Sequence, residues 1–210
     1  MNEVEKLRQI KSMGDTAAHS VAESMAALFG LEVNMKISSV NMVAVDTIPR
    51  LIGLSEDDVV AGSYISFSGF LNGSVLCVLT INSAREISDI MMAGMDDEPE
   101  PGAGIPFSDM QQSAIIEFTN IITSSFIDVY ANTLSTAVDQ SPPSFACDYM
   151  GSLLEVSLID ASKKGDFAFM FDTVLDVTDR DIELEVLVLP EMDSLQVIFD
   201  NLPEDSKIPL

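Results

Sequence analysis

The N-terminal part of the chain repeats its apolar residues with the period of an α-helix. Residues 4–29 place Ile10, Ala17, Val21 and Leu28 on one helical face, and Gly30 then supplies a stop. Extended chain is expected over residues 31–45. The pattern therefore predicts a long amphipathic helix followed by a strand.

A β-hairpin and a short helix are predicted next. Residues 63–79 carry β-forming side chains on both sides of Asn72-Gly73, a dipeptide that favours the positive φ angles of a tight hairpin turn. Ser83 and Glu86 have the spacing of a capping box, so a helix is expected to begin there and to end at Gly94.

The second part of the chain repeats this order. Ser108 with Gln111 predicts the start of a helix that runs to about Thr136, before the Ser141-Pro142-Pro143 stop. A short helical or irregular stretch is expected over 151–158. Two strands follow, 167–177 and 182–190, joined by a polar turn near 178–181 and followed by a short closing helix.

An acidic segment rich in proline and glycine, residues 96–106, divides the chain into these two parts. The simplest account is a single domain of two repeats, about 1–95 and about 107–203, joined by this linker. The expected fold class is α+β, with pseudo-two-fold duplicated halves. Each half would supply a long amphipathic helix, antiparallel strands and a short helix to one continuous β-sheet core.

The charge balance changes the picture of the surface. The 210 residues carry 34 Asp and Glu against 10 Lys and Arg, a net charge of −24. Such a field repels nucleic acids and anionic membranes, so neither partner is expected. The acidity fits either adaptation of a halophilic protein to a high-salt cytoplasm or a docking face for a basic partner.

Other classes of site are not indicated. Cys77 and Cys147 lie far apart in apolar or strand-like sequence, and His19 is the single histidine, so no metal site is expected. There is no phosphate-binding Gly-rich loop and no run of 18 apolar residues, which predicts a soluble cytoplasmic protein without membrane insertion.

Candidate chemistry lies on the helix of the second half. One side of this helix is apolar and is expected to pack on the sheet. The opposite side displays four polar residues at spacings of three and four, which share one helical face: Ser113, Glu117, Asn120 and Ser124. A carboxylate and a carboxamide are thus presented together from a rigid element.

A longer pattern includes this pair. Ser113, Glu117, Asn120 and Pro143 are separated by three, two and 22 residues. This spacing resembles the signature of the CheC, CheX and FliY phosphatases of chemotaxis. The layout of two halves, each led by a long helix, is similar to CheC over nearly the whole chain.

The resemblance implies an activity and residue roles. The family dephosphorylates the aspartyl phosphate of a CheY-type response regulator, which would be the partner. Asn120 would orient the attacking water, Glu117 would engage a lysine of the regulator, and Ser113 and Pro143 would be supporting positions. An amide can donate to and accept from a water without taking its proton. No cofactor of its own is expected, because Mg²⁺ and the neutralising lysine would come from the regulator.

The first half does not repeat the motif. An offset of 105 residues places Ser12 opposite Glu117 and Asp15 opposite Asn120, with Arg8 and Ser38 opposite Ser113 and Pro143. Asp15 lacks an amide donor and adds negative charge near a phosphate, and Ser12 cannot pair with a lysine as glutamate does. We expect this first site to be inactive, with its helix face, including His19, left as a contact surface.

Three alternatives stay open. With one motif lost, the chain fits a non-catalytic adaptor that engages CheY or CheD, the receptor deamidase that CheC relatives also bind. A flagellar switch component like FliY is less favoured, because little sequence follows Leu202 for motor assembly. A monomer is expected, since duplicated halves can satisfy one another, with a CheX-like dimer as the alternative.

Overall fold

The computed structural model describes residues 3–30, 32–93, 106–159, 167–177 and 180–202. The first half consists of α1 (Glu3–Phe29), β1 (Val33–Ala44), η1 (Val45–Thr47), α2 (Ile48–Leu51), β2 (Val59–Gly69), β3 (Gly73–Thr80) and α3 (Ile81–Met91). The second half consists of α4 (Asp109–Thr133), β4 (Val138–Gln140), β5 (Ser144–Tyr149), α5 (Met150–Ile159), β6 (Phe167–Val177), β7 (Arg180–Pro190) and α6 (Met192–Asp200). The predicted order of elements is confirmed in both halves.

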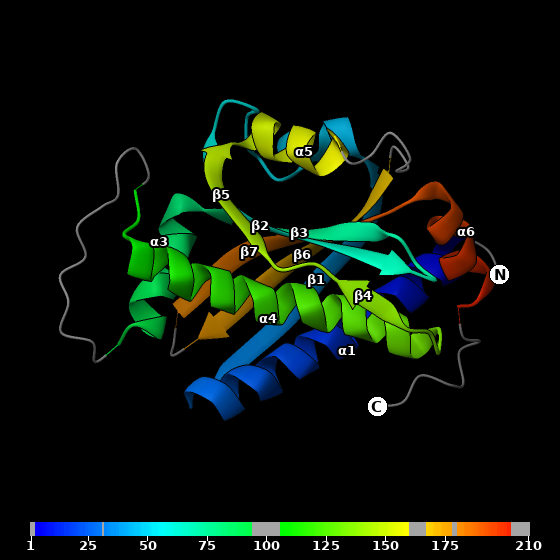
Figure 1. The fold of residues 1–210 in the computed structure, drawn as a ribbon, viewed down its shortest axis with the longest axis horizontal. Helices are drawn as coiled ribbons and strands as arrows, with labels where there is room; N and C mark the ends of the chain where they lie inside the picture. The colour runs from blue at the N-terminus through cyan, green and yellow to red at the C-terminus, as the bar shows by residue number, and fades with distance from the viewer. Residues whose placement is uncertain (1–2, 31, 94–105, 160–166, 178–179, 203–210) are drawn as a thin grey trace.

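One antiparallel sheet of seven strands joins the two halves (Figure 1). The strand order is β1-β6-β7-β3-β2-β4, and β5 also pairs with β2. The β6–β7 hairpin of the second half therefore lies between β1 and β3 of the first half, since β6 pairs with β1 and β7 pairs with β3. This arrangement confirms the predicted α+β fold with one continuous sheet. The proposed linker at 96–106 lies almost entirely outside the described residues.

Helices cover both faces of the sheet because its central strands are apolar on both sides. In β6, Phe169 and Phe171 face the core under α1 and α4, whereas Ala168 and Met170 face the smaller core under α2 and α5. Figure 1 shows α1 and α4 side by side and running in opposite directions. A strand buried on both faces explains why this part of the sequence is a continuous apolar run.

The long helix α4 begins where the sequence predicts. The Ser108 hydroxyl accepts from the Gln111 backbone N–H at 3.2 Å, and the Gln111 side chain accepts from the Ser108 N–H at 3.0 Å, which completes the capping box. Its apolar stripe, Ile115, Phe118, Ile122, Phe126 and Val129, is buried as expected. The opposite stripe is thereby directed outward.

Two local predictions were wrong. The turn between β2 and β3 is not a two-residue Asn72-Gly73 turn: pairing ends at Phe67 with Gly73, and the positive φ belongs to Gly69. Gly73 is instead a strand residue, where a Cβ would lie 2.5 Å from the Leu189 carbonyl oxygen. Close approach of a neighbouring strand, not turn geometry, requires this glycine.

The cap of α3 also differs from the prediction. Thr80, the last residue of β3, is the N-cap, and its hydroxyl accepts from the Ser83 N–H at 3.0 Å. The helix therefore begins at Ile81, three residues before the position that the Ser83-x-x-Glu86 pattern indicated. The short elements η1, α2, β4 and β5 were not predicted, because none has a clear apolar period.

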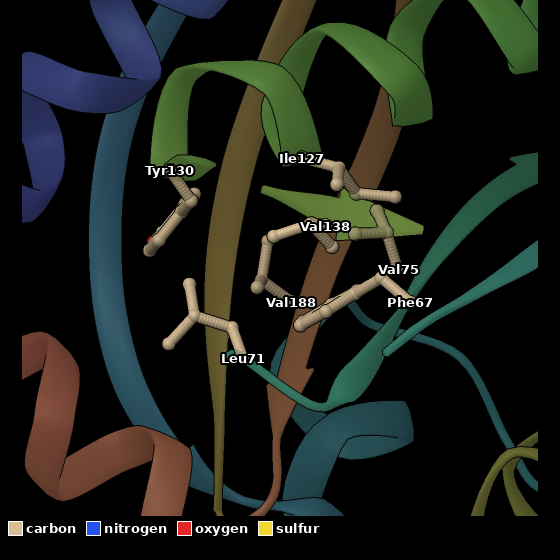
Figure 2. Close-up of a pocket in the computed structure, with 7 residues that line it drawn as sticks. All are labelled: Phe67, Leu71, Val75, Ile127, Tyr130, Val138 and Val188. Carbon is tan, nitrogen blue, oxygen red and sulfur yellow. The ribbon is translucent and has the colours of Figure 1, made fainter. Parts of the chain in front are cut away.

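A small apolar cavity lies between the C-terminal half of α4 and strands β2, β3 and β7. Figure 2 shows the seven residues around it, which are Phe67, Leu71, Val75, Ile127, Tyr130, Val138 and Val188. Tyr130 is buried, and no described residue is a hydrogen-bond partner of its hydroxyl. Burial raises the pKa of this phenol well above its usual range, so it stays neutral.

A carboxyl pair lies on the other face of the sheet. Glu185 of β7 is directly opposite Asp172 of β6, and Ser39 of β1 donates its hydroxyl to Asp172. Burial, with further contributions from the charge and hydrogen bond of Asp172 and the charge of Glu183, raises the pKa of Glu185 to about 8. The Glu185–Asp172 pair therefore holds a proton near neutral pH.

We expect Tyr130→Phe to raise the free energy of unfolding by about 1 kcal/mol, because it removes a buried hydroxyl that lacks a partner. Chemical denaturation of the two proteins measures the difference. A loss of more than about 1 kcal/mol would show instead that the hydroxyl is hydrogen-bonded, for example to a buried water.

We expect Glu185→Gln to flatten the stability profile between about pH 5 and pH 8. The folded-state pKa of about 8 exceeds the unfolded value of 4.5, so the wild type loses stability as the pH rises between these values. Glutamine cannot ionise, and the variant should gain about 2 kcal/mol at pH 9, a figure reduced for the partial exposure of the group. At pH 5 the two proteins should unfold at the same denaturant concentration. If the free energy of unfolding changes equally with pH in the two proteins from pH 5 to pH 9, Glu185 is not the group with the raised pKa.

Candidate active site

The predicted polar stripe lies on the outward side of α4. Ser113 and Glu117 are exposed, and Asn120 and Ser124 are half-buried. All four belong to consecutive turns of one helix, so their Cβ atoms line one side of it. The structure therefore brings together the side chains that the sequence placed on one face.

The functional ends of Glu117 and Asn120 are open to another molecule. None of the described residues forms a hydrogen bond or ion pair with the Glu117 carboxylate. The Asn120 Oδ1 accepts from the Ser124 hydroxyl at 3.4 Å, a long contact, and none of the described residues accepts a hydrogen bond from the Asn120 side-chain N–H groups. A carboxylate and an amide are thus offered together on a rigid surface.

Several buried hydroxyls on α4 were not recognised from the sequence. Thr119 and Thr123 are fully buried and donate to helix carbonyls one turn back, to Ile115 at 2.7 Å and to Thr119 at 2.8 Å. Because the helix satisfies these hydroxyls itself, polar residues can occupy its buried side. Ser113 does the same on the surface, donating to the Asp109 carbonyl at 2.9 Å.

Pro143 lies in the connection between β4 and β5, which runs along the flank of α4 (Figure 1). Ser141 fixes this connection, since its hydroxyl accepts from the Ser66 N–H at 3.0 Å and its N–H donates to the Ser66 carbonyl at 2.9 Å. The Gln140 amide also donates to Asp128 of α4 at 3.0 Å. The segment that contains Pro143 is thereby held against the motif helix.

The isoleucines that flank the stripe differ in burial. Ile127 is buried in the main core, and Ile121 packs against that core while half-exposed. Packing against the main core at the side of α4 therefore explains both of these isoleucines. Ile116 is half-buried, which leaves part of its surface next to Glu117 for contact with another protein.

The corresponding residues of the first half lie on α1 and are engaged differently. The Lys11 ammonium contacts the Asp15 carboxylate at 2.9 Å, and Ser12 is half-buried, with its carbonyl accepting from the Thr16 hydroxyl at 3.0 Å. His19 lies 3.4 Å from Glu23, and both are exposed. Asp15 therefore has an internal partner where Glu117 has none among the described residues.

Two further features are absent from the described part of the chain. No group of three or more His, Cys, Asp or Glu side chains has a metal-binding arrangement there. No helix in these ranges is long and apolar enough to cross a membrane. The apolar cavity of Figure 2 is lined by core residues and by none of the four residues of the stripe.

The sequence of this chain is similar to those of known chemotaxis proteins. A model described as the CheC-like family matches residues 110–146, which include α4 and Pro143. CheC1 of Halobacterium salinarum is 29% identical over 202 residues, 96% of this chain and 98% of that protein. The CheY-P phosphatase CheC of Bacillus subtilis is 24% identical over 197 residues, 93% of this chain and 92% of that protein.

Solved structures share the fold at low sequence identity. Thermotoga maritima FliY superposes with a TM-score of 0.70 at 15% identity, covering 96% of this chain and 97% of that one. The FliM middle domain from H. pylori gives a TM-score of 0.68 at 12% identity, covering 96% and 99%. The matched motif segment and the two relatives of similar length make the chain similar to CheC-type proteins, and the solved structures share its fold.

Proposed function

We propose that this chain hydrolyses the aspartyl phosphate of a CheY-type response regulator, with Asn120 orienting the water and Glu117 docking on the regulator. The relative in Bacillus subtilis is named as a CheY-P phosphatase, and it matches nearly the full chain. The observation that carries the proposal is the pair of open side chains, Glu117 and Asn120, on the outward side of α4.

In this proposal the chain acts by positioning the attacking water and the phosphoryl group. Water attacks the phosphorus as the bond to the aspartyl oxygen breaks, giving inorganic phosphate and a free carboxylate. The Asn120 amide would donate to the phosphoryl oxygen or accept from the water, so that the water oxygen lies in line with the breaking bond. Such a reaction needs orientation and charge neutralisation more than a protein nucleophile.

Glu117 would contribute to binding of the regulator and not to cleavage of the bond between phosphorus and the aspartyl oxygen. It lies one helical turn before Asn120, so a lysine that pairs with its carboxylate fixes where the amide meets the phosphoryl group. Mg²⁺ held by the regulator would neutralise the phosphoryl oxygens. Ser113 and Pro143 would support the helix and the flanking segment, and the first site, Ser12 and Asp15, would not catalyse.

The main competing proposal is a non-catalytic adaptor that binds CheY or CheD. The shared fold does not separate the two proposals. FliY and the FliM middle domain superpose on this chain with TM-scores of 0.70 and 0.68 at 15% and 12% identity, and a likeness of this kind shows the fold and not the activity. Turnover does separate them. An adaptor would bind the regulator without shortening the lifetime of its phosphate.

Asn120→Ala should abolish the accelerated loss of phosphate from a phosphorylated CheY-type regulator. We expect kcat to fall by about 100-fold or more, because alanine cannot orient the water. Phosphate release is followed with wild type, Asn120→Ala and the double variant Ser12→Ala/Asp15→Ala, which should retain wild-type turnover. If the double variant alone slows the reaction, the site lies in the first half. If wild type leaves the regulator's own decay unchanged, the phosphatase proposal is wrong.

Glu117→Gln should weaken docking while leaving the chemical step intact. Loss of the negative charge removes the partner of the regulator lysine, so KM should rise about tenfold with kcat changed less than about threefold. Initial rates over a range of regulator concentrations separate these parameters. A fall in kcat at unchanged KM would assign Glu117 to the reaction itself.

A further inference from the structure

Three of the basic side chains gather at one place in this acidic protein, directly after Glu3 and Glu5. The chain has 10 Lys and Arg against 34 Asp and Glu, yet Lys6, Arg8 and Lys11 follow one another within two turns of α1. We call these three residues the basic segment. Nowhere else in the described ranges does a helix or strand gather cations in this way.

The basic segment shares a surface with the candidate active site. Helix α1 buries Ile10, Met13 and Ala17 against the sheet, and Arg8 projects from its outward side. Because α1 and α4 lie side by side on the same face of the sheet, their outward sides form one surface (Figure 1). The helices run in opposite directions, so the basic segment lies toward the C-terminal end of α4.

The three cations differ in what they contact. The Lys6 ammonium lies 4.4 Å from the centre of the Phe199 ring, and Lys11 pairs with Asp15 at 2.9 Å. Arg8 is exposed, and none of the described residues is its hydrogen-bond or ion-pair partner. An arginine without a carboxylate partner, in a chain with a net charge of −24, is available to an external anion.

We propose that Arg8 is a second docking contact for the response regulator and binds a carboxylate on the regulator's surface. This inference rests on the proposed function, since it concerns the same partner. A regulator that carries a phosphorylated aspartate presents negative charge, which the net charge of this chain repels. The basic segment supplies local attraction on the surface that bears Glu117 and Asn120, and a guanidinium binds a carboxylate through two parallel N–H donors.

Two contacts of opposite sign also set the orientation of the bound regulator. Glu117 selects a cation at one end of the surface, and Arg8 selects an anion at the other. Docking in the reversed direction would bring like charges together at both ends, which disfavours it. The first half would thus contribute to recognition after losing the residues of the catalytic motif.

The test compares Arg8→Glu with Arg85→Glu, which makes the same charge change at an exposed arginine of α3. The dissociation constant of the regulator, loaded with a beryllofluoride phosphate mimic, is measured by fluorescence anisotropy for both variants and wild type. KM and kcat are measured with the phosphorylated regulator. Thermal unfolding confirms that both variants are folded.

We expect Arg8→Glu to raise the dissociation constant and KM about tenfold at low salt, with kcat within about twofold of wild type. Arg85→Glu should stay within about twofold in all three quantities. The difference should shrink as the salt concentration rises, because exposed charges are screened. Equal effects of the two substitutions, or a loss of kcat at unchanged KM for Arg8→Glu, would overturn the inference.

Failure of the docking proposal is distinguishable from failure of the proposed function. Asn120→Ala should bind the beryllofluoride regulator as tightly as wild type while turning over slowly. If wild type binds in an Arg8-dependent way without turnover, Arg8 docking stands and the phosphatase proposal fails. If turnover depends on Asn120 but the two arginine variants behave alike, the phosphatase proposal stands and Arg8 docking fails.

Discussion

The pairing of β3 with β7 is the constraint on which the rest of the structure depends. This ladder runs from Gly73 opposite Pro190 to Leu79 opposite Leu184 and joins the two halves at the centre of the sheet. Its strands are buried on both faces, so helices must cover each side. Helix α4 packs on the larger core through Phe118, Ile122 and Phe126, and this burial directs the opposite side of the helix, with Glu117 and Asn120, outward. The packing of the core therefore determines that Glu117 and Asn120 lie on the outward side of α4.

Sequence reasoning succeeded where the apolar period was long. Helices α1 and α4 and strands β6 and β7 were predicted because their patterns span ten or more residues, which leaves few alternatives. It failed at Gly73, because the turn propensity of Asn-Gly is local, whereas the approach of the Leu189 carbonyl is a tertiary contact. Strands β4 and β5 were missed since they are short, partly exposed edge strands that follow the end of a helix, with Pro142 and Pro143 between them.

The site was predictable in its placement and not in its detail. The helical period and the apolar stripe were enough to place Ser113, Glu117, Asn120 and Ser124 together on the outward face. The resemblance to CheC-type proteins, not the period, suggested their roles. The Ser124 contact to Asn120 and the bracing of the Pro143 segment through Gln140 and Asp128 depend on side-chain packing, which no spacing reveals.

The net charge favours an amide over a carboxylate at position 120 for the proposed reaction. A carboxylate at position 120 would place another negative charge beside a phosphoryl group, in a chain that already carries −24. The aligned Asp15 of the first half is such a residue, and Lys11 holds it within the helix surface. Asparagine offers both a donor and an acceptor without charge. The same electrostatic argument applies to the proposed docking, in which Arg8 would offset part of the repulsion between this acidic chain and a phosphorylated regulator.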